Sequence, residues 1–196
     1  MTSETTAWLT GEETRLLLRI ARESLERYVR DGDRLDVEQY PLTPTLRQSH
    51  GAFVTLRRGG DLRGCIGYTR SLEPLALAVR DNAINAGSRD PRFPPVRPEE
   101  LPGITVEVSA LCPGEEPDSP FIRVNDLSEV VLGRDGLFLE CGLARGGLLL
   151  PQVPVEQGWD LDQFLEALCR KAGVPDGAWR DPENTLYRFS AQVFSE

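Results

Sequence analysis

The sequence predicts an α+β fold, in which a mixed or antiparallel sheet is flanked by helices. Two observations lead to this prediction. Strand-like and helix-like segments are interspersed, but without the regular strand–helix–strand rhythm of a parallel sheet. Neighbouring strand-like segments are also separated by short, glycine-rich turn signals, as antiparallel hairpins require.

Helical patterns occur in three segments. Thr10 and Asp160 are suitable N-caps, and each is followed three residues later by Glu or Gln, which completes a capping box. Ser71 is expected to cap the remaining helix, with Pro74 in its first turn, and Gly173 to end the last one. The expected helices cover residues 10–30, 71–86 and 160–172.

Strand patterns surround these helices. Residues 51–68 read as a β-hairpin around Gly59 and Gly60, which can adopt positive φ. The turn signals at 135–136 and 145–147 are expected to separate three short antiparallel strands. Further strands are predicted by alternating side chains. Beyond the hairpin, the expected strands are 104–111, 130–132, 137–139, 148–150 and 185–194.

Composition limits the class of protein. The chain has 196 residues, an apolar fraction of 40% and no run near the ~20 apolar residues of a membrane-spanning helix. The first ten residues show no signal-peptide pattern, so we expect a cytoplasmic protein. Four scattered cysteines and one histidine predict no metal site, and the absence of nucleotide-binding motifs predicts no cofactor.

The arginines are unevenly distributed. Residues 47–97 contain nine arginines against four acidic residues, which makes this window +5 and leaves −14 for the rest of a chain whose net charge is −9. The overall charge argues against bulk binding of polyanions. The window itself suits an anionic carboxylate or phosphate group, because guanidinium binds both in a bidentate manner. The alternative is that these arginines pair with acidic residues elsewhere in the chain.

The segment 62–67 combines an arginine and a cysteine with two glycines. On a strand, Arg63 and Cys65 share one face with Gly67, whereas Leu62 and Ile66 point to the other face and are expected in the core. Glycines 64 and 67 leave room for another backbone or a ligand. A nearby arginine favours the thiolate, the form of cysteine that attacks electrophiles or binds metal.

The register of the hairpin decides what surrounds this cysteine. A two-residue turn at Gly59-Gly60 pairs Cys65 with Val54, which places the thiol among apolar groups. A three-residue loop pairs Cys65 with Thr55 and sets Arg63 beside Arg57. The sequence leaves both registers open.

A proline-rich loop follows at 87–98. It can act as a rigid anion clamp, with Arg89 and Arg92 as donors and Phe93 as a stacking face. It can equally be a rigid connector in which Asp90 and Arg92 stabilise its own turns. If the site needs a base, Asp90 or Glu107 is a better candidate than His50, which lies outside these motifs.

Three segments, 62–67, 90–95 and 149–153, occur in an order that resembles the AMMECR domain, called AmmeMemoRadiSam system protein A in bacteria and archaea. The resemblance covers residues 10–194. It implies one domain with an α+β fold of two subdomains that share a cleft. The larger subdomain is built from both chain ends, the smaller is inserted between them, and the segment around Cys65 lines the cleft.

The resemblance also implies partners: a Memo-like protein and a radical S-adenosylmethionine enzyme. The family has no established activity, so the sequence does not decide whether the chain is an enzyme. One hypothesis is an enzyme component with Cys65 as catalytic nucleophile or ligand and an anionic small molecule or nucleotide as substrate. The alternative is a non-catalytic binding or regulatory module for a protein or nucleic-acid partner. The expected substrate-binding residues are Arg63, Gly64, Gly67, Arg89, Asp90, Arg92 and Gln152.

Overall fold

The computed structural model describes residues 7–70, 73–114, 119–142 and 145–196. Two compact units divide this chain. The first unit comprises Ala7–Leu111 together with Gln192–Glu196, and the second unit comprises Cys112–Ala191. The strand order is β2 (Asp61–Tyr68), β1 (Ala52–Arg58), β3 (Ile104–Leu111), β7 (Asn184–Ser195), β5 (Asp135–Cys141) and β6 (Arg145–Leu149), with β4 (Ile122–Arg123) paired to β7. The strand pairs β1–β2, β1–β3, β4–β7, β5–β6 and β5–β7 are all antiparallel, and the predicted α+β class is confirmed.

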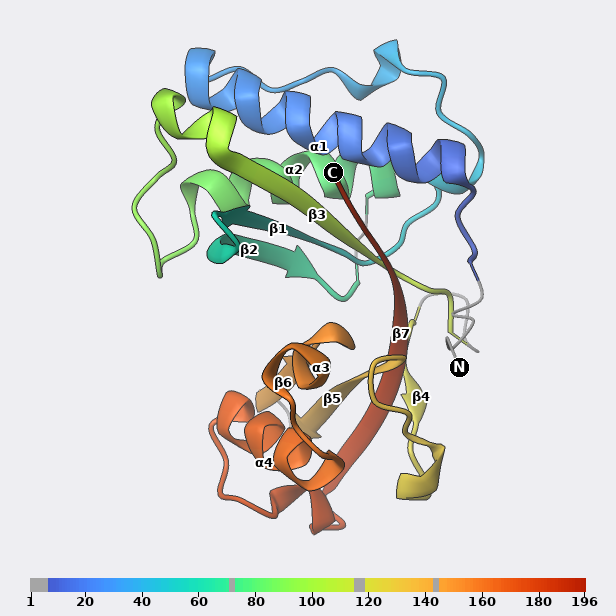
Figure 1. Cartoon of the computed structure of the whole chain (residues 1–196). Coiled ribbons are helices and arrows are strands. Elements are labelled where there is room, and N and C mark those ends of the chain that lie inside the picture. The colour runs from blue at the N-terminus through green and yellow to red at the C-terminus, as the bar shows by residue number, and fades with distance from the viewer. Residues whose placement is uncertain (1–6, 71–72, 115–118, 143–144) are drawn as a thin grey trace. The chain divides into compact units, whose positions relative to one another are not determined.

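The first unit places two helices on one face of a sheet (Figure 1). Its main elements are α1 (Gly11–Asp31), β1 (Ala52–Arg58), β2 (Asp61–Tyr68), α2 (Leu75–Ser88) and β3 (Ile104–Leu111). Short 3₁₀ helices η1 (Val37–Gln39), η2 (Thr45–Arg47) and η3 (Pro98–Gly103) connect them. Alternate residues of β1 and β3 enter the core beneath α1 and α2. These buried strand residues are Ala52, Val54, Leu56, Val106, Val108 and Ala110.

The ends of these helices follow local signals in part. Thr10 caps α1 through the predicted capping box with Glu13. The second helix begins at Leu75, with Pro74 in the N-cap position rather than in the first turn. The expected cap, Ser71, lies outside the described residues. No helix in the described part of the chain is long and apolar enough to cross a membrane.

The second unit packs α4 (Leu161–Ala172) against β5 (Asp135–Cys141) and β6 (Arg145–Leu149). The chain also forms β4 (Ile122–Arg123), η4 (Leu127–Glu129), α3 (Gln152–Gln157), η5 (Ala178–Arg180) and β7 (Asn184–Ser195), whose last residues belong to the first unit. The predicted capping box at Asp160 and the glycine stop at Gly173 are both present. The core is formed by residues such as Leu137, Leu139, Phe164 and Leu168.

Several predictions for this unit are wrong. Residues 135–136 and 145–147 lie inside strands instead of forming turns, and 130–132 form no strand. A Cβ on Gly147 would lie 2.6 Å from the Ala172 nitrogen, and one on Gly136 would lie 2.4 Å from the Phe189 ring. These glycines therefore serve close packing, which has the same sequence signal as a turn. The sequence reading also missed α3.

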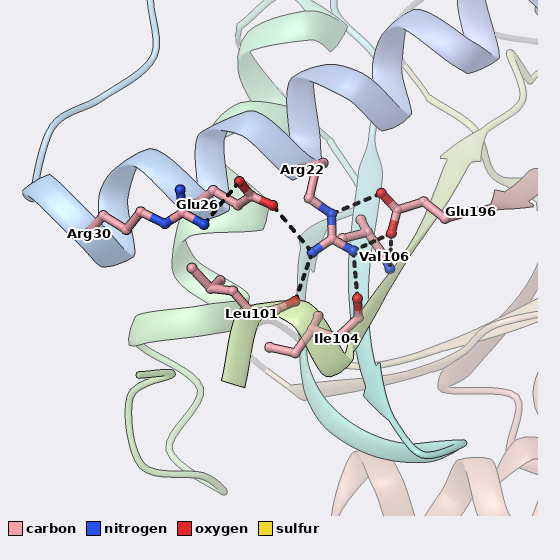
Figure 2. Close-up of polar contacts among 7 residues, drawn as sticks. All are labelled: Arg22, Glu26, Arg30, Leu101, Ile104, Val106 and Glu196. Carbon is pink, nitrogen blue, oxygen red and sulfur yellow. Dashed lines mark hydrogen bonds and ion pairs between the residues drawn. The ribbon is translucent and has the colours of Figure 1, made fainter. Parts of the chain in front are cut away.

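The end of β7 is held in the first unit by Arg22 of α1 (Figure 2). The Glu196 carboxylate accepts hydrogen bonds from the Arg22 guanidinium and, at 3.0 Å, from the amide of Val106 in β3. Arg22 also donates to the carbonyl of Ile104 at 2.6 Å. One guanidinium thus connects a helix and two strands.

Candidate functional site

The hairpin of β1 and β2 combines features of both registers that the sequence left open. Arg58 pairs with Asp61, as a two-residue turn requires, but Cys65 pairs with Thr55. Both hold because the register shifts next to Leu56 and Arg57, where Leu56 pairs with Gly64 and Arg57 with Leu62. Arg63 is therefore the extra residue of a β-bulge, and the bulge moves Cys65 opposite a polar side chain.

The bulge also changes the sheet face to which the preceding side chain, that of Leu62, points. Leu62 pairs with Arg57, so it shares the face of Thr55 and Cys65 and is 38% exposed. The prediction of a core position for Leu62 is therefore wrong, since the extra residue restarts the alternation. Ile66, after the bulge, packs against the core as predicted.

The half-buried Cys65 thiol lies on the sheet face opposite the two helices, beside a hydroxyl donor. The Thr55 hydroxyl oxygen lies 3.3 Å from the Cys65 sulfur and donates a hydrogen bond to it. The register places Glu107 of β3 on the other side of Thr55. Cys65, Thr55 and Glu107 therefore form one cross-strand row on the face away from α1 and α2.

The backbone of Cys65 is held by the proline-rich loop. Because β2 is the edge strand in the strand order, the N–H and C=O of Cys65 that point away from β1 have no partner among the described strands. The Cys65 N–H donates to the Asp90 carboxylate at 2.8 Å, and Arg92 donates to the Cys65 carbonyl at 3.2 Å. Two side chains thus replace the backbone of a neighbouring strand.

Asp90 and Arg92 form a tight pair within this loop. The Arg92 guanidinium donates to both carboxylate oxygens, at 2.9 and 2.7 Å, and the Arg92 N–H adds a third bond at 3.1 Å. The hydrogen bond from Arg92, outweighing burial, holds the pKa of Asp90 far below its ordinary value, with the Cys65 amide contributing. Asp90 is therefore an anchor, and its lowered pKa makes it a poor proton acceptor.

Arg63 is fixed by a second acidic residue. Its guanidinium donates to both Glu100 oxygens, at 3.0 and 3.1 Å, which with the Arg97 amide lowers the Glu100 pKa to about 2. The Phe93 ring lies near two guanidinium groups, with its centre 5.9 Å from the Arg63 guanidinium carbon and 5.6 Å from the Arg92 guanidinium carbon. These contacts connect the loop to the bulge.

The glycines of the motif are closely packed. A Cβ on Gly64 would lie 2.2 Å from the Ala86 carbonyl oxygen in α2, and a Cβ on Gly67 would lie 2.3 Å from the Phe53 ring. The sequence predicted that these glycines leave room for either another backbone or a ligand. At Gly64 the neighbour is the backbone of α2.

The structure separates the remaining candidates. Arg89 is exposed at the end of α2, without an ion pair to any described residue. Gln152 begins α3 in the second unit, so it is not among the residues that surround Cys65 within the first unit. His50 packs edge-on against Trp8, with 4.6 Å between ring centres. Of the expected bases, Glu107 lies in the row of Cys65.

The arginine-rich window pairs extensively with acidic side chains, in agreement with the second alternative above. At least five of its arginines form ion pairs within the described part of the chain: Arg47, Arg58, Arg63, Arg80 and Arg92. Sequence reasoning named Thr55 as the partner of Cys65 in one of its two registers, but it missed Glu100 as part of the site. The Glu100 carboxylate also accepts the Arg97 N–H at 2.9 Å, but arginine cannot accept as an N-cap, so no capping-box signal indicated Glu100, and its bond to Arg63 is a tertiary contact.

No group of three or more potential metal ligands occurs within the described ranges.

The AMMECR1 family model matches residues 18–194, most of the chain. The chain belongs to the AMMECR1 family. A protein of Methanothermobacter thermautotrophicus is 48% identical over 190 residues, which cover 96% of each chain, and one of Thermococcus gammatolerans is 46% identical over 92% of this chain and 88% of the relative.

A solved structure is also similar. The crystal structure of an uncharacterized protein from Pyrococcus horikoshii has a TM-score of 0.83 and 39% identity, over 92% of this chain and 89% of that one. The resemblance seen in the short motifs therefore extends over most of the fold, and the predicted family is confirmed.

Proposed function

We propose that this AMMECR1-family chain acts through the Cys65 thiol, as an enzyme component that handles an anionic small molecule or nucleotide. The observation that carries this proposal is the row in which Thr55 donates a hydrogen bond to the Cys65 sulfur at 3.3 Å. A hydroxyl donor stabilises the thiolate, the reactive form of cysteine, and Glu107 on the same face is the candidate proton acceptor.

The arginines beside this row keep part of their hydrogen-bonding capacity. Arg92 is exposed, and its bonds to Asp90 and Cys65 use Nε and Nη2. Nη1 of Arg63 is buried and has no hydrogen-bond partner within the described ranges. An anionic group at the open edge of Arg92 would meet a guanidinium already oriented by Asp90, as an anion clamp requires.

The partners in this proposal come from the family resemblance. We propose a Memo-like protein and a radical S-adenosylmethionine enzyme as the proteins with which the chain acts. Gly64, Gly67, Arg89 and Gln152 stay candidate substrate contacts in this proposal, alongside the arginines.

A binding or regulatory module is the second candidate. The observation that favours it is charge pairing: Arg63 in the bulge and Arg92 in the loop each form a two-pronged pair with a carboxylate. Such pairs make a stiff, nearly neutral surface, which suits recognition of a protein or nucleic-acid partner as well as it suits catalysis.

Thiol reactivity tests the first candidate. We would alkylate the folded protein with iodoacetamide at neutral pH and measure each cysteine by peptide mass spectrometry. Cys141 is the internal control, because it is half-buried like Cys65 and burial raises its pKa. We expect Cys65 to react about tenfold faster than Cys141, and Thr55→Val to remove most of that advantage.

If Cys65 reacts no faster than a cysteine in the urea-unfolded chain, the thiol mechanism is wrong. Co-purification then tests the second candidate. Cys65→Ser should leave capture of partner proteins intact, whereas Arg92→Ala should abolish it if the surface serves recognition.

A further inference from the structure

A groove in the second unit is lined by none of the residues around Cys65, and it is independent of the function proposed for that cysteine. It encloses about 370 Å³ and is lined by residues 123–125 and Leu127 on one side and 179–182 on the other, together with the start of β7 (184–186). The groove lies where the segment after β4 separates from β7. The Val124 amide still donates to the Leu186 carbonyl at 2.9 Å, and beyond it the chain leaves β7 to form η4.

One wall of this groove is rigidly built. The Asn184 side-chain amide donates to the Ala178 carbonyl at 2.8 Å, and its backbone N–H donates to the Asp181 carbonyl at 2.9 Å. The Gly177 N–H donates to Glu166 of α4 at 3.0 Å. The segment from Gly177 to Asn184 is therefore held before any ligand arrives, which reduces the entropy cost of binding.

Each wall contributes an exposed arginine. Arg123 and Arg180 are both exposed, and neither forms an ion pair with any residue in the described ranges. Arg180 stacks its guanidinium over the Trp179 ring, 4.0 Å from the ring centre. Stacking orients the guanidinium plane and leaves its N–H edge available to an anion.

The carboxylate in the lining does not cancel these charges. Asp181 is the acidic residue of the groove, and one of its oxygens accepts the Glu183 N–H at 3.0 Å. Two arginines against one aspartate leave a positive groove on a chain whose net charge is −9. Asn125 and Thr185 add neutral hydrogen-bonding groups, and Trp179 adds an apolar ring.

We propose that this groove binds a small organic dianion whose charged oxygens lie between Arg123 and Arg180. Bidentate guanidinium contacts suit a phosphate monoester or a dicarboxylate, and the volume lies within the range of small-molecule sites, about 300–1,000 Å³. The indole favours a ligand that also carries a flat apolar group.

Titration of the ¹⁵N-labelled full chain with phenyl phosphate, inorganic phosphate and succinate tests this site. At constant ionic strength, phenyl phosphate should shift the amides of 123–127 and 179–186 saturably, and bind at least tenfold more tightly than inorganic phosphate. Arg123→Ala and Arg180→Ala should each weaken binding about tenfold. Arg15→Ala is the matched control, because this exposed arginine of α1 also has no ion pair to described residues, and it should leave binding unchanged.

The comparison among ligands assigns the oxyanion. If succinate binds more tightly than phenyl phosphate, the ligand is a dicarboxylate and needs no aromatic ring. That result would still support an anion-binding site in this groove. Non-saturable shifts, shifts centred on residues 89–97, or equal loss in Arg15→Ala would each overturn the proposal. If Arg180→Ala fails to fold, Arg123→Ala decides the result alone, since its exposed side chain supports no described ion pair.

Discussion

Asp90 should be the residue on which the local structure around Cys65 depends most. Its carboxylate accepts hydrogen bonds from four N–H groups: the Cys65 amide and the Arg92 amide, Nε and Nη2. The Asp90 side chain is 2% exposed, whereas that of Arg92 is 49% exposed. Replacement of Asp90 by alanine therefore leaves a sheet-edge amide without its acceptor, while Arg92 can regain water.

The expected cost follows from this difference. An unsatisfied buried amide costs about 1–3 kcal/mol, and each hydrogen bond to a charged group contributes about 1.5–3 kcal/mol, much of which water restores for Arg92. We expect Asp90→Ala to destabilise the first unit by about 3–4 kcal/mol at pH 7. Asp90→Asn keeps an acceptor and loses the charge, so it should cost about 2 kcal/mol.

Native-state hydrogen exchange of amides in β1 and β2 measures this free energy for the first unit alone. The pKa of Asp90 is lowered on folding from an ordinary value of 3.8, so its stabilising contribution is complete above that value and declines as the pH falls toward the lowered pKa. The difference between wild type and Asp90→Asn should thus persist at pH 5 and shrink below about pH 3.5. A cost below about 0.5 kcal/mol, or an unchanged exchange rate at Cys65 in Asp90→Ala, would refute this account of the site.

Two further predictions concern the same unit. Glu196→Gln should lower stability by about 1–2 kcal/mol at pH 7, because its bonds to Arg22 and to the Val106 amide outweigh burial and lower the Glu196 pKa below 4.5. The loss should fade as the pH falls below that value, as measured by the urea midpoints of both proteins, and a pH-independent difference would contradict it. Gly64→Ala should cost about 3 kcal/mol, since its Cβ would lie 2.2 Å from the Ala86 carbonyl oxygen and backbone must move. Gly103→Ala is the control, with its nearest atom at 3.9 Å, and equal thermal shifts in the two variants would disprove the packing argument.

Local patterns in the sequence were sufficient for much of the fold. The capping boxes at Thr10 and Asp160 begin α1 and α4 as expected, and the alternation at 185–194 lies within β7. Each of these signals involves residues a few positions apart, so the sequence contains all the interacting partners. The glycines at 136 and 147 misled the reading because the atoms that exclude a side chain there come from distant segments.

The candidate site divides in the same way. By itself, the sequence determined the family, through its ordered motifs, and directed attention to Arg63, Cys65 and the loop of Asp90 and Arg92. Only the tertiary structure decided that a bulge at Arg63 sets Cys65 opposite Thr55, exposes Leu62 and brings Glu107 into the same row. The reason is physical: one extra residue in a strand changes which side chains face each other, and its position depends on the packing of the whole sheet.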